Sequence, residues 1–184
     1  MKILDFYRYL DKLKSTKREG WIADGIMDSE SVADHSLSVA TLSMILAPRL
    51  KVDRDKIIKM ALIHDIGESI IGDVQWYTPG KGIDKKVLAK KEKDEGKAVR
   101  KILETLGDDE YLKLWEEMEE KKTREAKIHK EIDRIDLALQ AYFNEKRTGK
   151  NLTRFFDFTD LFISEPLIKE IMKKIRKNRK KSEN

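Results

Sequence analysis

Apolar residues recur every three to four positions along most of this chain, which is the spacing of one face of an α-helix. Alternation of apolar and polar residues, the pattern of a half-buried strand, does not occur over any convincing length. The periodicity predicts helices at about 2–16, 30–50, 54–68, 82–106, 109–120, 123–147 and 165–180. No internal repeat or flexible linker separates them. We therefore predict an all-α fold, a single-domain helical bundle without strands.

Residues that begin and end helices support this division. Asp28 or Ser29 is expected to cap the helix at 30–50, and Asp53 the helix that follows, because their side chains can accept hydrogen bonds from free backbone N–H groups. Thr123 is expected to cap the helix at 123–147 in the same way. Gly149 suits the exit from that helix, where a left-handed residue is common.

The most apolar of the predicted helices ends at the adjacent pair His64 and Asp65. At helical spacing His64 continues the ridge formed by Ile57 and Ala61, and Asp65 continues a second ridge through Leu62. Both polar side chains should therefore be buried. A buried carboxylate without a partner is very costly, so Asp65 requires a cation or several hydrogen-bond donors. A metal ion would satisfy both residues.

Further candidate ligands are few, because the chain has three histidines and no cysteine. His35 lies in the amphipathic helix predicted at 30–50, and Asp133 lies among the apolar positions of the helix at 123–147, one turn after His129. Three helices can thus bring His35, His64, Asp65 and Asp133 to one centre. Such a set suits a divalent transition metal without choosing among them. The alternative is a buried polar network that holds no metal.

Five short segments carry a family resemblance when they are taken together and in order. They are Arg-Glu-Gly-Trp at 18–21, Glu-Ser-Val-Ala-Asp-His-Ser at 30–36, His-Asp-Ile-Gly-Glu at 64–68, Gly-Asp at 72–73 and Lys-Glu-Ile-Asp at 130–133. This pattern resembles the HD-domain metal-dependent phosphohydrolases, and within them the 5′-deoxyribonucleotidase branch. The resemblance covers roughly residues 3 to 146.

The resemblance implies an enzyme with a metal centre. It implies that His35, His64, Asp65 and Asp133 bind a divalent transition metal. The candidates are Co, Mn, Ni, Zn and Fe, and these ligands do not choose among them. The implied reaction is hydrolysis of deoxyribonucleoside 5′-monophosphates by a metal-activated water. His129 does not belong to the family pattern, so we expect it beside the ligands or at the surface.

Glu68 and Asp65 are the expected catalytic residues. Glu68 lies one helical turn beyond Asp65, so its carboxylate can face the same cavity and move protons; the alternative is a surface glutamate at a helix end. Arg18 and Trp21 resemble the pair that the family places over its substrate. The residues alone would make Arg18 a surface arginine, and Trp21 could instead fill the core.

Asp73 resembles the family residue that accepts a hydrogen bond from the sugar 3′-hydroxyl and leaves little room for a 2′-hydroxyl. Its alternative is an ordinary residue of a Gly-Asp turn. The chain departs from the family directly after it, with Val-Gln-Trp-Tyr at 74–77 before Thr-Pro at 78–79. Base preference therefore does not carry over from the resemblance.

Composition narrows the class of protein. The chain has 184 residues, of which 40% are apolar, which is enough for a folded core. It has no cysteine and therefore no disulfide. No stretch approaches the roughly 18 consecutive apolar residues of a membrane span, and the N-terminus lacks a secretory apolar segment. We expect a cytoplasmic protein that does not bind membranes.

Basic residues are concentrated at one end of the chain. The formal net charge is +5, and the excess comes from the Lys and Arg residues at 173–184. This tail lacks aromatic residues for stacking on bases, so we interpret it as a solvated helix end that frays, and nucleic acid is not the expected partner. The remainder divides into an HD core at about 3–146 and a helical extension at 147–172.

Rival functions remain within and outside the family. The same centre could belong to another HD-type nucleotide phosphohydrolase, such as a triphosphatase, a phosphodiesterase or an alarmone hydrolase. It could also belong to a non-catalytic HD module that binds a nucleotide or RNA. The expected partner is a small-molecule nucleotide, and the resemblance together with the amphipathic helices favours a homodimer.

Overall fold

The computed structural model describes residues 2–78, 82–107 and 109–181. Within these ranges the regular elements are helices, apart from one short hairpin and an isolated bridge between Lys17 and Ser31. The elements in order are α1 (Ile3–Ser15), α2 (Glu19–Ala23), α3 (Val32–Leu50), α4 (Arg54–Ile63), α5 (Glu68–Ile71), β1 (Tyr77–Thr78), β2 (Gly82–Ile83), α6 (Lys85–Leu103), the 3-10 turn η1 (Glu104–Leu106), α7 (Glu110–Glu119), α8 (Arg124–Thr148), α9 (Thr153–Phe162) and α10 (Pro166–Lys181). The prediction of an all-α fold is confirmed.

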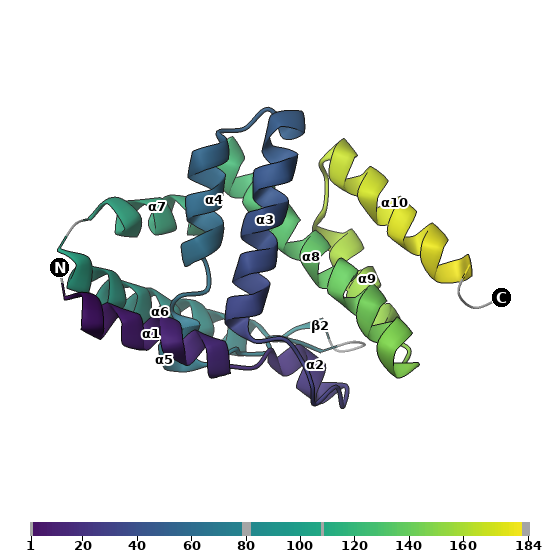
Figure 1. Ribbon diagram of the computed structural model, residues 1–184, viewed down its shortest axis with the longest axis horizontal. Coiled ribbons are helices and arrows are strands. Elements are labelled where there is room, and N and C mark those ends of the chain that lie inside the picture. Colours follow the sequence, from purple (N-terminus) through teal and green to yellow (C-terminus); the bar gives the residue numbers. More distant parts are fainter. Residues whose placement is uncertain (1, 79–81, 108, 182–184) are drawn as a thin grey trace.

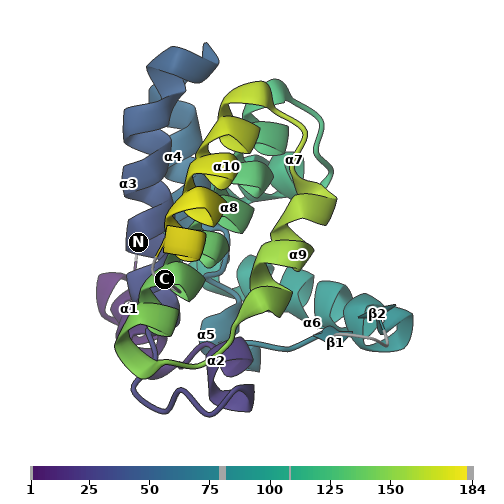
Figure 2. The same ribbon diagram turned by 90° about the vertical axis from the view of Figure 1, so that its right-hand side faces the viewer.

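Helix α8 is the longest element and packs against helices on both sides. The antiparallel pair α3 and α4 lies on one side of it, and α9 and α10 lie along the other (Figure 1). Helices α1 and α6 run beside one another below this group, with α7 above them (Figure 1). Figure 2 shows the β1–β2 hairpin beyond the end of α6, below α9.

Two hydrophobic clusters fill the interior, and α4 contributes to both. One cluster joins α3, α8, α9 and α10 and includes Ile57 and Ala61 of α4. The second joins α1, α6 and α7 and includes Met60 and Ile63 of α4. Because opposite faces of α4 enter different clusters, the end of this helix lies where the two clusters meet. The polar pair that follows α4 is thereby carried into the interior.

The predicted capping residues can be compared with the observed helix ends. Asp53 accepts a hydrogen bond from Lys56 N at 3.0 Å, and Thr123 accepts one from Ala126 N at 3.3 Å, so both predictions are confirmed. Gly149 has a φ of 69° at the end of α8, also as predicted.

The predicted cap of α3 is wrong. Ser31, not Asp28 or Ser29, caps the helix: its side chain accepts a hydrogen bond from Asp34 N–H, and the Asp34 side chain accepts one from Ser31 N–H. This reciprocal arrangement requires an acceptor three residues after the cap. Ser31 is followed by such a residue, and the Asp34 carboxyl has a lowered pKa because it accepts hydrogen bonds from the backbone and side chain of Ser31.

The prediction of a bundle without strands is also wrong. Tyr77–Thr78 pairs antiparallel with Gly82–Ile83, and two residues per strand are too few to leave an alternating pattern in the sequence. Pro79 of the predicted loop lies outside the described residues. The helix expected at 54–68 is instead divided into α4 and α5, and the short helices α2 and α9 were not expected.

The tail at 173–184 was predicted to be a helix end that frays. Its residues 173–181 instead belong to α10, which continues to Lys181. Arg179 contacts Glu145 at 2.6 Å, and Arg176 contacts Asp160 at 2.6 Å and Asp157 at 2.9 Å. Two basic residues of the tail thus bind α10 to α8 and α9. Residues 182–184 of the tail lie outside the described part. No described helix combines the length and apolar character needed to cross a membrane.

Replacing Ser31 with alanine is expected to lower the free energy of unfolding by about 1 kcal/mol, because the cap of α3 loses a hydrogen bond to a backbone N–H group. Urea unfolding followed by circular dichroism measures the change. Ser38→Ala, in the middle of the same helix, is the matched control and should leave stability within about 0.5 kcal/mol of the parent protein. Equal effects of the two substitutions would contradict the capping role.

Candidate active site

Four of the predicted polar side chains meet at one centre. His35 comes from α3, His64 and Asp65 follow α4, and Asp133 comes from α8. His35 Nε2 lies 3.3 Å from His64 Nε2, 3.2 Å from Asp133 Oδ1 and 3.7 Å from Asp65 Oδ2. His64 Nε2 lies 3.2 Å from Asp65 Oδ2. The three predicted helices therefore do bring these donor atoms together.

The burial predicted around Asp65 is only partly correct. Ile57 and Ala61, which form the ridge that leads to His64, are fully buried. Leu62, which belongs to the ridge that leads to Asp65, is 52% exposed. The helix ends at Ile63, so the residues after it no longer follow helical spacing and Asp65 turns toward the centre independently of Leu62. The Asp65 side chain is 14% exposed and lines a cleft.

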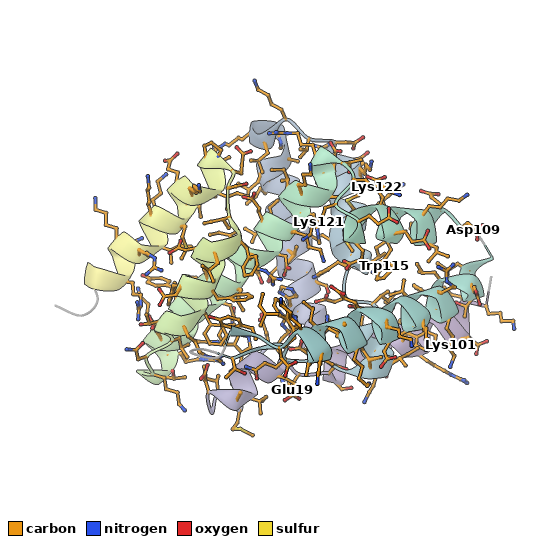
Figure 3. All side chains as sticks on the ribbon, turned by 180° about the vertical axis from the view of Figure 1, so that it is seen from behind. Glu19, Lys101, Asp109, Trp115, Lys121 and Lys122 are labelled. Atoms are coloured by element: carbon orange, nitrogen blue, oxygen red, sulfur yellow. The ribbon has the colours of Figure 1, made fainter. Side chains whose placement is uncertain are left out.

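The turn after α4 is held by close packing against two other helices. Trp115 of α7, labelled in Figure 3, donates a hydrogen bond from Nε1 to the carbonyl of His64 at 3.3 Å. Gly67 lies against α6 so closely that a Cβ atom there would come within 3.0 Å of side-chain atoms of both Glu95 and Val99. A larger residue here would require its neighbours to move by a few tenths of an ångström.

Each histidine is oriented by its second ring nitrogen. His64 Nδ1 donates to the carbonyl of Ala61 at 2.8 Å, which directs Nε2 toward the centre. His35 Nδ1 lies 2.8 Å from Asp136 Oδ2, which is buried one turn beyond Asp133 on α8. Both Nε2 atoms therefore point to the centre, in the manner of histidines that bind metals.

The donor set fits a divalent metal. Ligand bonds of about 2.0–2.1 Å place neighbouring ligand atoms about 2.8–3.4 Å apart in octahedral or tetrahedral geometry. Three of the four separations given above lie within or near this range, and His35, His64 and Asp133 form a group that could hold an ion. Imidazole nitrogen and carboxylate oxygen are also the ligands that such metals take.

Strong electrostatic fields act on these groups. Burial by itself would raise the pKa of Asp65, but His64, Arg18 and His35 hold it well below its usual range. Hydrogen bonds with Asp133 and Asp136 outweigh burial and raise the pKa of His35 to about 10 in the metal-free protein. A protonated His35 is thus the alternative cation for a network without metal. In either case the carboxylates require positive charge at this centre.

Arg18 and Asp73 lie beside the donor atoms. Arg18 Nη1 is 3.2 Å from Asp65 Oδ2 and 3.9 Å from Asp73 Oδ1. The side chains of both residues are 14% exposed, so the alternative of a surface arginine is wrong. Asp73 Oδ2 accepts a hydrogen bond from the backbone N–H of Glu19 at 2.8 Å, which connects the end of α5 to the start of α2.

Trp21 has a structural role as well as a place in the cleft wall. Its side chain is 1% exposed, its Nε1 donates to Glu30 Oε1 at 2.9 Å, and its ring lies 4.2 Å from that of Phe155. The same residue lines the cleft next to Arg18. Trp21 therefore fills the core as well as lining the cleft, and its contact with a substrate stays a prediction.

Glu68 is buried, so the alternative of a surface glutamate is wrong. It is 2% exposed, and its Oε1 atom lies 3.2 Å from Lys91 Nζ of α6. Its Oε2 atom has no hydrogen-bond partner among the described residues. Burial, together with the nearby charges of Asp65 and Asp73, raises the pKa of Glu68 well above its usual range. Burial thus favours the protonated form of Glu68, and Lys91 opposes this shift.

His129 is buried rather than at the surface. It is fully covered, its ring lies 5.0 Å from that of His64, and neither ring nitrogen has a partner among the described residues. Burial and the charge on His64 keep the pKa of His129 well below its usual range. His129 is therefore a neutral side chain that packs behind His64.

Several residues of the site were missed by sequence reasoning. Lys91 Nζ lies 3.2 Å from both Glu68 Oε1 and Glu95 Oε2. Lys91 and Glu95 are four residues apart on a helix, which predicts that they form a pair. This spacing does not predict that the pair is buried. Asp136 lies three residues after Asp133, on the same face of α8, and this spacing could have revealed it.

Two clefts meet at Trp76 and Arg134, which line both. The first leads from Arg18 and Asp73 to a group of aromatic side chains. The second includes His64 and Asp65 in its lining and is edged by charged residues: Lys91, Glu92, Glu95, Glu119, Lys121, Lys127, Lys130 and Glu131. Lys121 lies at the end of α7, where Figure 3 labels it.

This fold and centre match a known family, since a model of the HD domain family matches residues 10–176. The chain belongs to the HD domain family. The resemblance to HD-domain proteins is therefore confirmed, and the match includes α9 and the first part of α10.

Relatives agree over nearly the whole chain. A protein of Dictyostelium discoideum named 5′-deoxynucleotidase HDDC2 is 36% identical over 96% of this chain and 98% of its own length. The protein of that name from Homo sapiens is 30% identical over 96% of this chain and 86% of its own length. A solved structure of a conserved hypothetical protein from Pyrococcus furiosus matches with a TM-score of 0.77 and 34% identity, covering 95% of this chain and 99% of that chain.

Replacing Lys91 with methionine is expected to lower the free energy of unfolding by roughly 3 kcal/mol at pH 7, because Glu68 and Glu95 would lose a buried counter-charge. Burial raises the pKa of both carboxyls, so the folded state binds more protons than the unfolded state. Stability of the variant should therefore fall as pH rises, and its deficit should be smaller at pH 5 than at pH 7. Urea unfolding at both pH values measures this.

Lys90→Met is the matched control. Lys90 also pairs with an acid four residues later, Asp94, at 2.7 Å, but its side chain is 80% exposed. Its loss should cost less than about 1 kcal/mol. A deficit for Lys91→Met that is as small as this, or that does not change with pH, would contradict a buried ion pair.

Proposed function

We propose that this HD domain is a metal-dependent phosphomonoesterase that hydrolyses deoxyribonucleoside 5′-monophosphates to deoxynucleoside and phosphate. The observation that carries the proposal is the convergence of two imidazoles and two carboxylates beside Arg18 and Asp73, at the end of a cleft. The relatives named 5′-deoxynucleotidase support the choice of substrate.

In this proposal His35, His64, Asp65 and Asp133 hold one divalent transition metal, drawn from Co, Mn, Ni, Zn and Fe. When bound, such an ion supplies Lewis acidity toward a water molecule and a phosphoryl oxygen. Asp65 would act both as a ligand and as a carboxylate beside the reacting groups. The fit of the donor separations to ordinary metal–ligand bonds supports this assignment.

Arg18 is proposed to bind the phosphoryl group. Its guanidinium offers several N–H donors in a plane and keeps its charge at any physiological pH. In the free protein this charge is balanced by Asp65 and Asp73, which lie at 3.2 Å and 3.9 Å. The guanidinium is therefore already held next to the donor atoms before a substrate arrives.

Glu68 is proposed to move the proton that the reaction requires. Water attacks phosphorus, the bond from phosphorus to the nucleoside 5′-oxygen breaks, and one proton passes from the water to the leaving oxygen. A carboxyl group with a raised pKa can both accept and return a proton near neutral pH. Its Oε2 atom is not engaged by any other described residue, so it is available for this role.

Asp73 is proposed to accept a hydrogen bond from the sugar 3′-hydroxyl and to select deoxyribose. Its carboxylate is fixed by the backbone of Glu19, so it has little freedom to move away from an additional 2′-hydroxyl. Trp21 would form part of the wall beside the sugar. We further propose that the protein acts in the cytoplasm as a homodimer, consistent with its amphipathic helices.

Asp65→Asn is expected to lower kcat/KM for deoxyribonucleoside monophosphates by at least about 100-fold, because one metal ligand loses its charge. Released phosphate, measured across deoxyribonucleotides and ribonucleotides, reports the activity. Elemental analysis of protein purified without added metal should find a transition metal in the parent protein and less in the variant.

Asp55→Asn is the control for that experiment, since Asp55 lies in the first turn of α4 and its side chain is 84% exposed. It should retain the activity and metal of the parent protein. Full activity of Asp65→Asn, or no release of phosphate by the parent protein from any monophosphate with any of the five metals, would refute the proposal.

Asp136→Asn is expected to weaken metal binding by about tenfold, because a neutral acceptor makes the His35 ring a poorer ligand. Isothermal titration calorimetry with Co²⁺ or Mn²⁺ on metal-free protein measures this. Asp160→Asn, which alters an exposed acid on α9 that pairs with Arg176, should leave the affinity unchanged. Equal affinities for all three proteins would show that Asp136 does not support the ligand.

A further inference from the structure

An aromatic wall forms part of the lining of the first cleft. Trp76 and Tyr77 lie at the start of the hairpin, and Phe158 lies on α9. The Phe158 ring is 4.5 Å from the ring of Tyr77 and 5.7 Å from that of Trp76. Phe158 is 6% exposed, whereas Trp76 and Tyr77 are only half-buried. The two hairpin residues therefore present ring surface to the cleft on a rigid support.

Arg134 links this wall to the proposed metal centre. Its guanidinium lies 5.2 Å from the centre of the Phe158 ring and 5.7 Å from that of Trp76. Its Nη1 atom also lies 3.3 Å from Asp133 Oδ2. A cation held between aromatic faces and a carboxylate fixes the position of the wall relative to Asp133.

The lining of this cleft therefore combines two kinds of side chain. Arg18 and Asp73 supply charged groups, and Trp76, Tyr77 and Phe158 supply flat apolar surface. A nucleoside monophosphate has matching parts: an anionic phosphate, a sugar with hydroxyl groups, and a flat base. We propose that Trp76, Tyr77 and Phe158 form the subsite for the nucleobase, and that Trp76 stacks on it; this rests on the proposed function.

Most polar side chains around this part of the cleft already have partners. Arg154 Nε donates to Asp24 Oδ2 at 2.7 Å and its Nη2 donates to the carbonyl of Gly20 at 3.0 Å. Gln75 Nε2 donates to the carbonyl of Tyr77 at 3.2 Å. The base is therefore bound in this subsite by stacking, and not by hydrogen bonds from Arg154 or Gln75 to its edge.

The test compares a substrate that has a base with one that lacks it. Trp76→Ala is expected to raise KM for 2′-deoxyadenosine 5′-monophosphate by about 5- to 100-fold with little change in kcat, since stacking on one base is lost. KM for 2-deoxyribose 5-phosphate should not change. Trp76→Phe keeps a ring and should retain most of the affinity for the nucleotide.

Two further variants separate base binding from folding. Phe158→Leu keeps an apolar side chain in the core but removes the ring that supports Trp76 and Tyr77, and it should also raise KM for the nucleotide alone. Tyr7→Ala removes a 52% exposed ring of α1 and should change KM for neither substrate. If Trp76→Ala and Phe158→Leu raise KM equally for both substrates, or raise it for neither, the base subsite is overturned.

Binding of 2′-deoxyadenosine, which has no phosphate, provides a readout independent of hydrolysis. Isothermal titration calorimetry should find at least about fivefold weaker binding to Trp76→Ala than to the parent protein or to Trp76→Phe. Equal binding to all three would overturn the subsite even if the parent protein hydrolyses nucleotides. A fivefold difference would support it even if no monophosphate is hydrolysed, in which case only the proposed reaction fails.

Discussion

The balance of charge on the turn between α4 and α5 is the constraint on which the site depends. This turn brings Asp65 and Glu68 into the interior, where an unpaired carboxylate would be very costly. Each acid meets a base from a distant part of the chain: Arg18 lies beside Asp65, and Lys91 lies beside Glu68. The loop before α2 and the helix α6 are thereby fixed around the turn, and the donor atoms of α3 and α8 close the centre from the other side.

The pattern of apolar positions predicted the long helices and placed His35, His64 and Asp133 on buried faces, because a polar residue on an apolar stripe points inward. It was not sufficient beyond the end of α4. There the chain leaves helical spacing, so the direction of the Asp65 side chain could not be inferred from that of Leu62, which is exposed. The hairpin was missed for a related reason, since two-residue strands carry no period.

Residues that act through partners distant in sequence were also beyond the reach of local patterns. The pairing of Lys91 with Glu95 was visible as an i,i+4 spacing, but its contact with Glu68 depends on how α6 packs against α5. Arg134 gave no signal, because it is one charged residue among many on α8. Its role appears only when Trp76 of the hairpin and Phe158 of α9 are placed around it.

Gly67 has a consequence that reaches beyond local packing. A Cβ atom at this position would lie 3.0 Å from side-chain atoms of Glu95 and Val99, so a larger residue would push the turn and α6 apart by a few tenths of an ångström or displace those side chains. The ammonium group of Lys91 is delivered by that same helix one turn earlier. The small size of Gly67 thus lets α6 lie near enough for the ammonium group of Lys91 to reach the buried carboxylate of Glu68.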